Sequence, residues 1–133
     1  MTAITVSAVS LIEQTASIRL VPLGEAVVFG DLLYLNSTDG KWYKADAADQ
    51  AKIKVEAMAV TGGAADTFAV VLIRGKVHLG TAVTATEVYA LGVGGGVVPK
   101  ADLVAGNYLV VLGFGDVDGN LDFQPTNTGT QVP

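Results

Sequence analysis

The stretch whose residue types and spacing best suit chemistry is "DVDGNLD" at 116–122. Four oxygen-bearing side chains alternate there like the first ligands of a calcium loop: Asp116, Asp118, Asn120 and Asp122. An EF-hand loop needs Gly at its sixth position and Glu at its twelfth, but this stretch has Leu121 and Asn127 there. A hairpin turn at "VDGN" explains the same residues with fewer assumptions. We therefore predict a turn and no cofactor, and calcium binding is the alternative.

The remaining candidates for catalysis lack the partners that catalysis needs. His78 is the one histidine, and a catalytic histidine requires a nucleophile or carboxylate that the sequence does not place beside it. We interpret it as a strand residue near a turn. The glycine-rich "GVGGG" at 92–96 lacks the Lys-Ser/Thr pair of a phosphate-binding loop and is interpreted as a flexible turn. Since the chain also has no cysteine, it has no thiolate chemistry. The sequence predicts a protein that is not an enzyme.

The amino-acid composition indicates which classes of binding partner suit this chain. The chain of 133 residues suits one domain, and its net charge of −5 argues against nucleic acid as a partner. Half of its residues are hydrophobic and only 16% are charged, below the roughly 25% of ordinary domains. No apolar stretch approaches the roughly 20 residues of a membrane-spanning helix. An apolar chain of this kind is expected to cover its surface by binding itself or a large partner.

The elements that position these residues are predicted to be strands. Short apolar runs separated by Gly or Asp turns are typical of an all-β sandwich or barrel. We predict a compact β-sandwich or barrel-like single domain over 21–123, an N-terminal arm or edge strand at 1–20 and an extended polar tail at 124–133. The expected strands are 2–7, 16–22, 25–29, 32–36, 41–44, 55–61, 67–74 with a continuation through 76–79 past a bulge at Gly75, 88–91, 97–98, 107–113 and 121–123.

Three local features of these elements are also predicted. In "ASIRLVP" the alternation places Ile18 and Leu20 toward the core and Arg19 toward solvent. The unbroken apolar run at 67–74 is expected to be buried on both faces. One or two helical turns are expected within 46–54, with Asp46 as the N-cap.

A repeat organises the chain. Residues 24–46 align without gaps on residues 80–102, and eight of the 23 positions are identical, including the Lys-Ala-Asp that ends each segment. Each copy places an acidic residue before a strand, a turn of small residues after it and then a return strand. An apolar strand follows each copy, so the related units cover about 24–61 and 80–113. Because an isolated hairpin is marginally stable in water, the two units are expected to pack on one another.

Two regions are candidate interfaces. The N-terminal stretch offers apolar side chains that would suit strand addition to a neighbour's sheet edge: Ile4, Val6, Val9, Leu11 and Ile12. In the first hairpin, Trp42 and Tyr43 lie near Tyr34 in sequence. These aromatic residues are interpreted either as cross-strand packing or as a binding patch.

The first copy of the repeat, "GEAVVFGDLLYLNSTDGKWYKADAAD", resembles the small capsid decoration (cement) proteins of tailed bacteriophages. Many of those proteins carry the motifs found here as Gly24-Glu25, Gly30-Asp31, Tyr34-Leu35, Asp39-Gly40-Lys41, Tyr43 and Ala45-Asp46. The resemblance extends more loosely to about residue 115. The second copy departs from it, because Thr86-Glu87 stands where Gly-Asp would be expected.

The resemblance implies a structural virion protein on the capsid exterior, a small β-domain that is often a trimer. Its partner would be the major capsid protein, and its role would be to stabilise the expanded, DNA-filled head. The alternative is a head-fibre or tail-associated β-module that binds a host surface glycan through the aromatic residues around Trp42. A third possibility is a monomeric β-barrel that encloses a small ligand.

Overall fold

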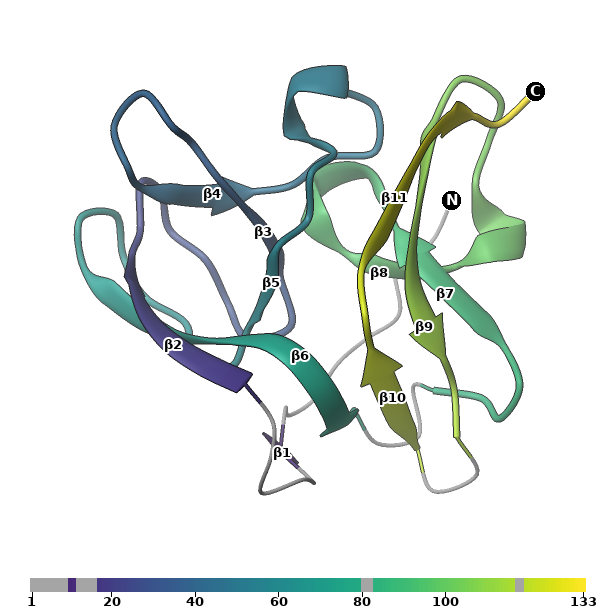
Figure 1. Ribbon diagram of the computed structural model, residues 1–133, viewed down its shortest axis with the longest axis horizontal. Coiled ribbons are helices and arrows are strands. Elements are labelled where there is room, and N and C mark those ends of the chain that lie inside the picture. The colour runs from purple at the N-terminus through teal and green to yellow at the C-terminus, as the bar shows by residue number, and fades with distance from the viewer. Residues whose placement is uncertain (1–9, 12–16, 80–82, 117–118) are drawn as a thin grey trace.

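The computed structural model describes residues 10–11, 17–79, 83–116 and 119–133, and it consists of two antiparallel sheets (Figure 1). The seven-stranded sheet contains β1 (Ser10–Leu11), β2 (Ser17–Pro22), β3 (Leu32–Leu35), β4 (Trp42–Lys44), β5 (Ala57–Ala59), β6 (Phe68–His78) and β10 (Asn120–Phe123). The four-stranded sheet has the order β11-β9-β7-β8 and contains β7 (Val88–Leu91), β8 (Val97–Pro99), β9 (Tyr108–Phe114) and β11 (Thr126–Gln131).

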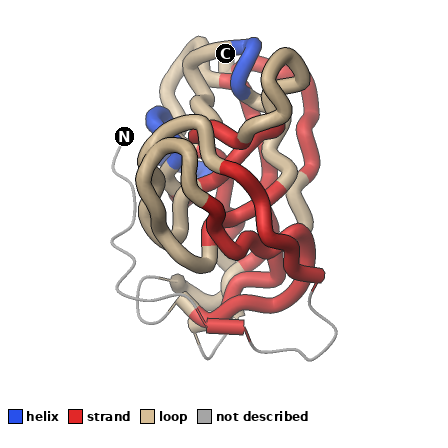
Figure 2. Tube along the Cα trace, turned by 90° about the vertical axis from the view of Figure 1, so that its left-hand side faces the viewer, coloured by secondary structure: helices blue, strands red, loops and turns tan. Residues whose placement is uncertain are grey.

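The prediction of a compact all-β single domain is confirmed. The two sheets pack together and do not close into a barrel. Within the described ranges, the helical residues form only short 3₁₀ turns, drawn in blue in Figure 2: η1 (Gln50–Lys52), η3 (Val93–Gly95) and η4 (Lys100–Asp102). The first of these falls inside the predicted helical segment. Its N-cap is Asp49, whose carboxylate accepts from the Ala51 N–H at 3.0 Å, and not the expected Asp46.

Most strand predictions match the structure, and three differ. Residues 25–29 do not form a strand, because only Val27 makes an isolated bridge, to Gly63. The register shift in β6 falls at Ile73 and not at Gly75, since Ser17 lies opposite Arg74 and Ile18 opposite Leu72. The polar segment that the sequence analysis places beyond the domain is extended, and its residues 126–131 form β11 along β9.

Strand β6 occupies the centre of the first sheet and spans two pairings. Its first half pairs with β2 and β5, while its second half pairs with β10 and β1. The expected burial of this run on both faces is only partly met, because Phe68 is exposed. Further along, Val71 and Leu72 are fully buried and contribute to two different hydrophobic clusters.

The two aligned segments share strand connectivity. Strand β3 lies between β4 and β5, as β7 lies between β8 and β9. We call residues 17–72 the first repeat and 73–124 the second repeat. Their turns before the central strand also agree at the spacing of 56: Asp31 N–H donates to Val28 O at 3.2 Å and Glu87 N–H to Thr84 O at 3.3 Å. Thr86 takes a positive φ of 65° where the first repeat has Gly30 at 88°.

The repeats differ at the tips of their hairpins. In the first repeat Leu35 pairs with Trp42, but in the second Leu91 pairs with Val97. The turn of the second hairpin is therefore one residue shorter. As a result, the two Lys-Ala-Asp sequences are not placed alike, because Lys44 ends β4 whereas Lys100–Asp102 forms η4 beyond β8.

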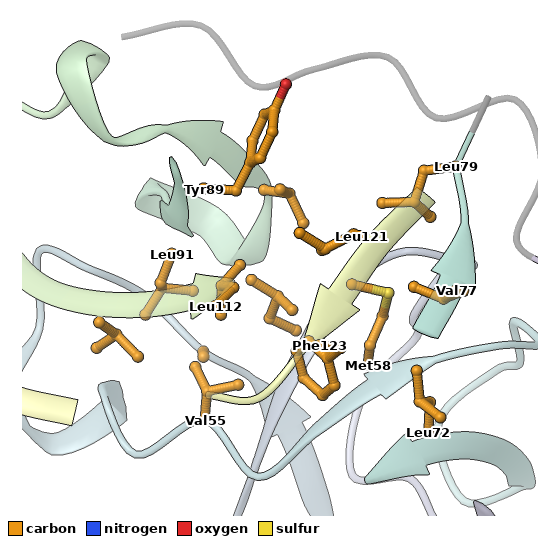
Figure 3. Packing of buried hydrophobic residues seen from close by; sticks show 14 of the residues in the cluster. Val55, Met58, Leu72, Val77, Leu79, Tyr89, Leu91, Leu112, Leu121 and Phe123 are labelled. Atoms are coloured by element: carbon orange, nitrogen blue, oxygen red, sulfur yellow. The ribbon is translucent and has the colours of Figure 1, made fainter. Parts of the chain in front are cut away.

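The hydrophobic core consists of two clusters, which differ in the repeat that supplies their residues. The buried residues of the smaller cluster come from the first repeat and include Leu23, Leu33 and Val71, and Ile73 packs against them. The larger cluster joins both repeats: Figure 3 shows Met58 from β5 and Phe123 from β10 in the same packed group. The second repeat contains the counterparts of the smaller cluster, since Leu79 and Tyr89 lie 56 residues after Leu23 and Leu33 and are buried in the larger one.

A buried charge in β6 should unfold the domain. Val71 is fully buried, so Val71→Asp places an unpaired carboxylate in the core and should cost about 3 kcal/mol or more of unfolding free energy. The matched control is Val104→Asp, because Val104 is 51% exposed and its substitution should cost less than about 0.5 kcal/mol. Thermal melts followed by circular dichroism compare the variants, and a Val71→Asp protein that melts like the control would contradict this account of the core.

Candidate functional site

The acidic stretch lies between β9 and β10. Asp116 N–H donates to Asn120 O at 2.8 Å, and Gly119 N–H donates to Asp116 O at 3.3 Å. Val117 and Asp118, the first of which opens the predicted "VDGN" turn, lie outside the described residues.

The described side chains of this stretch face different partners. Asn120 Oδ1 is 2.8 Å from His78 Nδ1 across the β6–β10 pair, and Asp116 Oδ2 is 3.4 Å from Lys76 Nζ. The Asp122 carboxylate accepts from the Gln124 side-chain amide. Among the residues that the structure describes, no group of three or more His, Cys, Asp or Glu side chains is placed to hold a metal ion. His78 is the last residue of β6, which confirms the prediction that it is a strand residue.

The glycine-rich turn at 92–96 has a packing role. Gly94 and Gly95 both have positive φ, at 80° and 92°, and Gly95 is buried. A Cβ atom at position 95 would lie only 3.2 Å from Ala45 O and 3.3 Å from Lys44 Cβ. Glycine is thus required where the second hairpin approaches the backbone of the first.

Trp42 is a core residue, which corrects its prediction as an interface residue. Its side chain is 4% exposed and belongs to the cluster of the first repeat. On its remaining exposed side, the Arg19 guanidinium lies 6.0 Å from the ring centroid. The glycan hypothesis requires Trp42 to lie in an exposed groove, but Trp42 is buried. Of the aromatic residues of the first hairpin, only Tyr34 and Tyr43 are exposed enough to contact a sugar.

Tyr43 is the centre of a small polar and aromatic group on the first hairpin. Its ring stacks on Tyr34 with centroids 6.0 Å apart, and a Cβ at Gly24 would lie 2.1 Å from its Cζ atom. Its hydroxyl donates a hydrogen bond to Asp39 Oδ2. This bond raises the pKa of Tyr43 to about 12 and lowers the pKa of the Asp39 carboxyl. Next to it, Lys41 Nζ pairs with Asp66 Oδ1 at 2.7 Å.

The exposed apolar residues of β2 and β6 were missed by the sequence analysis. Ile18 and Leu20 were expected to face the core, but both are exposed, and the neighbouring Phe68 is 63% exposed. We call Ile18, Leu20 and Phe68 the apolar strip. The reason is the two-residue period of a strand: because Val21 is buried in the core, the alternate residues Ile18 and Leu20 must face outward. Arg19 meanwhile reaches Trp42 from the other face.

The N-terminal candidates can be placed only in part. The backbone of Leu11 pairs with Val77 as part of the short strand β1. Ile4, Val6, Val9 and Ile12 lie outside the described residues.

Comparison of the sequence with protein-family models and with curated proteins gives no match. No helix among the described residues is long and apolar enough to cross a membrane.

The tyrosine–aspartate pair gives a titration that can be measured. The neutral Tyr43 hydroxyl is favoured in the folded state, so this stabilisation is present below pH 10 and lost as the pH rises through about 12. The Asp39 partner has the opposite dependence, because its contribution is present above its ordinary pKa of 3.8 and lost as the pH falls below that value. We expect one of the four tyrosines to ionise late in an ultraviolet absorbance titration.

The late phase should disappear in Tyr43→Phe and move to lower pH in Asp39→Asn, since the latter removes the negative charge that opposes phenolate formation. Asp102→Asn, on the exposed η4, is the control and should leave the late phase in place. A late phase that survives Tyr43→Phe would assign the shift to another tyrosine.

Proposed function

We propose that this chain is a non-enzymatic structural protein of a virion, a capsid decoration protein that binds the major capsid protein on the outside of the head. The observation that carries the proposal on this molecule is the apolar strip on β2 and β6, which exposes Ile18, Leu20 and Phe68. At the spacing of 56 the second repeat has Arg74 and Lys76 in place of Ile18 and Leu20, and Asn120 pairs with His78 as Phe68 pairs with Pro22. Apolar side chains confined to one repeat are the kind of surface that a large partner covers.

The mechanism requires no chemistry. A protein that binds the assembled shell, and not its dissociated subunits, stabilises the shell by mass action. A homo-oligomer multiplies this effect through avidity, and the resemblance implies a trimer. In this proposal the apolar strip contacts the capsid, and the internal pressure of packaged DNA is resisted by bridges between neighbouring capsid subunits.

The alternative is a fibre- or tail-associated module that binds a host glycan. The stacked pair of Tyr34 and Tyr43 favours it, because partly exposed aromatic rings suit the apolar faces of sugars. Burial of Trp42 removes the largest ring from that surface. Tyr43→Ala should abolish binding to host surface sugar under this alternative, and it should leave capsid binding unchanged under the main proposal.

The decisive experiment adds the purified chain to expanded capsids that lack it and measures their melting temperature. We expect a rise that saturates with added protein, and a smaller rise or none with Leu20→Asp, which places a charge in the apolar strip. Val104→Asp is the matched control, since it adds the same charge at an exposed site outside the strip. Capsids that melt at the same temperature with and without the wild-type chain would refute the proposal.

The N-terminal arm is tested by truncation. Deleting residues 1–12 should weaken binding to capsids or to other copies of the chain while leaving the thermal melt cooperative, because the described residues of both buried clusters lie at position 21 and beyond. Binding isotherms of the truncated and full-length chains are compared by co-sedimentation with capsids. Equal affinity would show that the arm takes no part in binding.

A further inference from the structure

Where the two repeats pack together, the first repeat contributes a face that has no equivalent contact in the second. On this face Leu32 of β3 pairs with Met58 of β5, and both side chains are fully buried in the larger cluster. Ala45 and Ala47, just beyond β4, are fully buried beside them. We call Leu32, Ala45, Ala47 and Met58 the inter-repeat face.

The second repeat covers this face in two places: Phe123 of β10 lies beside Met58 (Figure 3), and the tip of the second hairpin lies against Ala45 and Ala47. Gly92 O accepts from the Ala47 N–H at 3.3 Å, and Gly95 sits against Ala45 O and Lys44 Cβ. Leu91, at the base of the same tip, is fully buried in the shared cluster. The repeats therefore pack head to tail: the hairpin tip of one meets the inter-repeat face of the other.

Head-to-tail packing leaves the equivalent face of the second repeat uncovered by the residues that the structure describes. At the spacing of 56, the pair Leu32–Met58 becomes Val88–Phe114, which is also a cross-strand pair. Phe114 is 61% exposed although Met58 is fully buried, and Ala101, which lies 56 residues after Ala45 but within η4, is exposed as well. An open depression of about 440 Å³ lies here, lined by Thr86, Glu87, Val88, Lys100 and Ala101. We call Val88, Ala101 and Phe114 the open face.

The first repeat has an exposed surface of its own, because its hairpin tip packs against no equivalent face within the described structure. Leu35, the counterpart of the buried Leu91, is 42% exposed, and residues 37–40 beyond it are exposed. Asp39 in this tip and Lys100 beside the open face carry opposite charges, which favours docking of the tip there.

From these two exposed surfaces we infer that the chain associates with copies of itself head to tail. The hairpin tip of one copy, residues 35–41, docks on the open face of the next. The contact inside the chain is the precedent for the contact between chains. Because the two surfaces differ, the interface is heterologous, and it forms a closed ring when the rotation between copies permits closure. This inference goes beyond the capsid proposal and does not depend on it.

Single substitutions test both halves of the interface. At about 100 μM, where micromolar interfaces are populated, the wild-type chain should sediment as an oligomer. Phe114→Asp on the open face and Leu35→Asp on the tip should each reduce the mass to the 13.6 kDa of one chain. Val104→Asp adds the same charge at an exposed position outside both surfaces and should remain oligomeric. Phe114→Thr, which keeps a strand-forming residue, serves if Phe114→Asp loses its cooperative melt.

Mixing the two monomeric variants distinguishes head-to-tail from symmetric association. The Phe114→Asp chain keeps an intact tip and the Leu35→Asp chain keeps an intact open face, so one functional interface forms between them. We expect a 1:1 complex that grows no further, because each partner has lost its other surface. A symmetric contact between two open faces would instead leave Leu35→Asp associated on its own.

Three results would overturn the inference: a wild-type chain that is monomeric at this concentration, a Phe114→Asp variant that remains oligomeric, or a mixture of the two variants that stays monomeric. If another segment of the same chain covers the open face, the wild-type chain gives the first of these results. Since all measurements use the purified chain, they can fail while capsid stabilisation succeeds, and the reverse also holds.

Discussion

The continuity of strand β6 is the constraint on which the rest of the molecule depends. One strand of 11 residues completes the first repeat with its N-terminal half and begins the second with its C-terminal half. The backbone contacts at its two ends correspond: Leu23 N–H donates to Thr67 O, and Leu79 N–H donates to Gly119 O. Because a single strand belongs to both repeats, its course limits how the two repeats can be placed relative to one another.

Local turn chemistry could be predicted from the sequence because it depends on few residues. The turns at Gly30 and Thr86 precede equivalent strands, and the alignment at a spacing of 56 finds both from residue types alone. The strands around them follow, since turn residues bound each apolar run. The polar end of the chain was harder to predict, because β11 is stabilised by pairing with β9 and not by apolar side chains of its own.

The orientation of side chains could not be predicted in the same way. Ile18 and Leu20 alternate with Arg19, and alternation alone does not say which set faces the core. That choice depends on the long-range pairing of β2 with β6 and on burial of Val21. Burial of Trp42 likewise depends on the first repeat having a cluster of its own. The low charge of the chain therefore predicted an exposed apolar surface without indicating where it lies.

The two repeats share their strand connectivity but differ on their surfaces, and the two proposed roles fall on different repeats. The apolar strip exists only in the first repeat, because Arg74 and Lys76 replace Ile18 and Leu20 in the second. The open face exists only in the second, because packing covers its equivalent in the first. A surface for a large partner and a surface for another copy of the chain can then coexist without competing. Such a division is available to a duplicated unit only when its copies pack asymmetrically, since symmetric packing would bury or expose the same face on both.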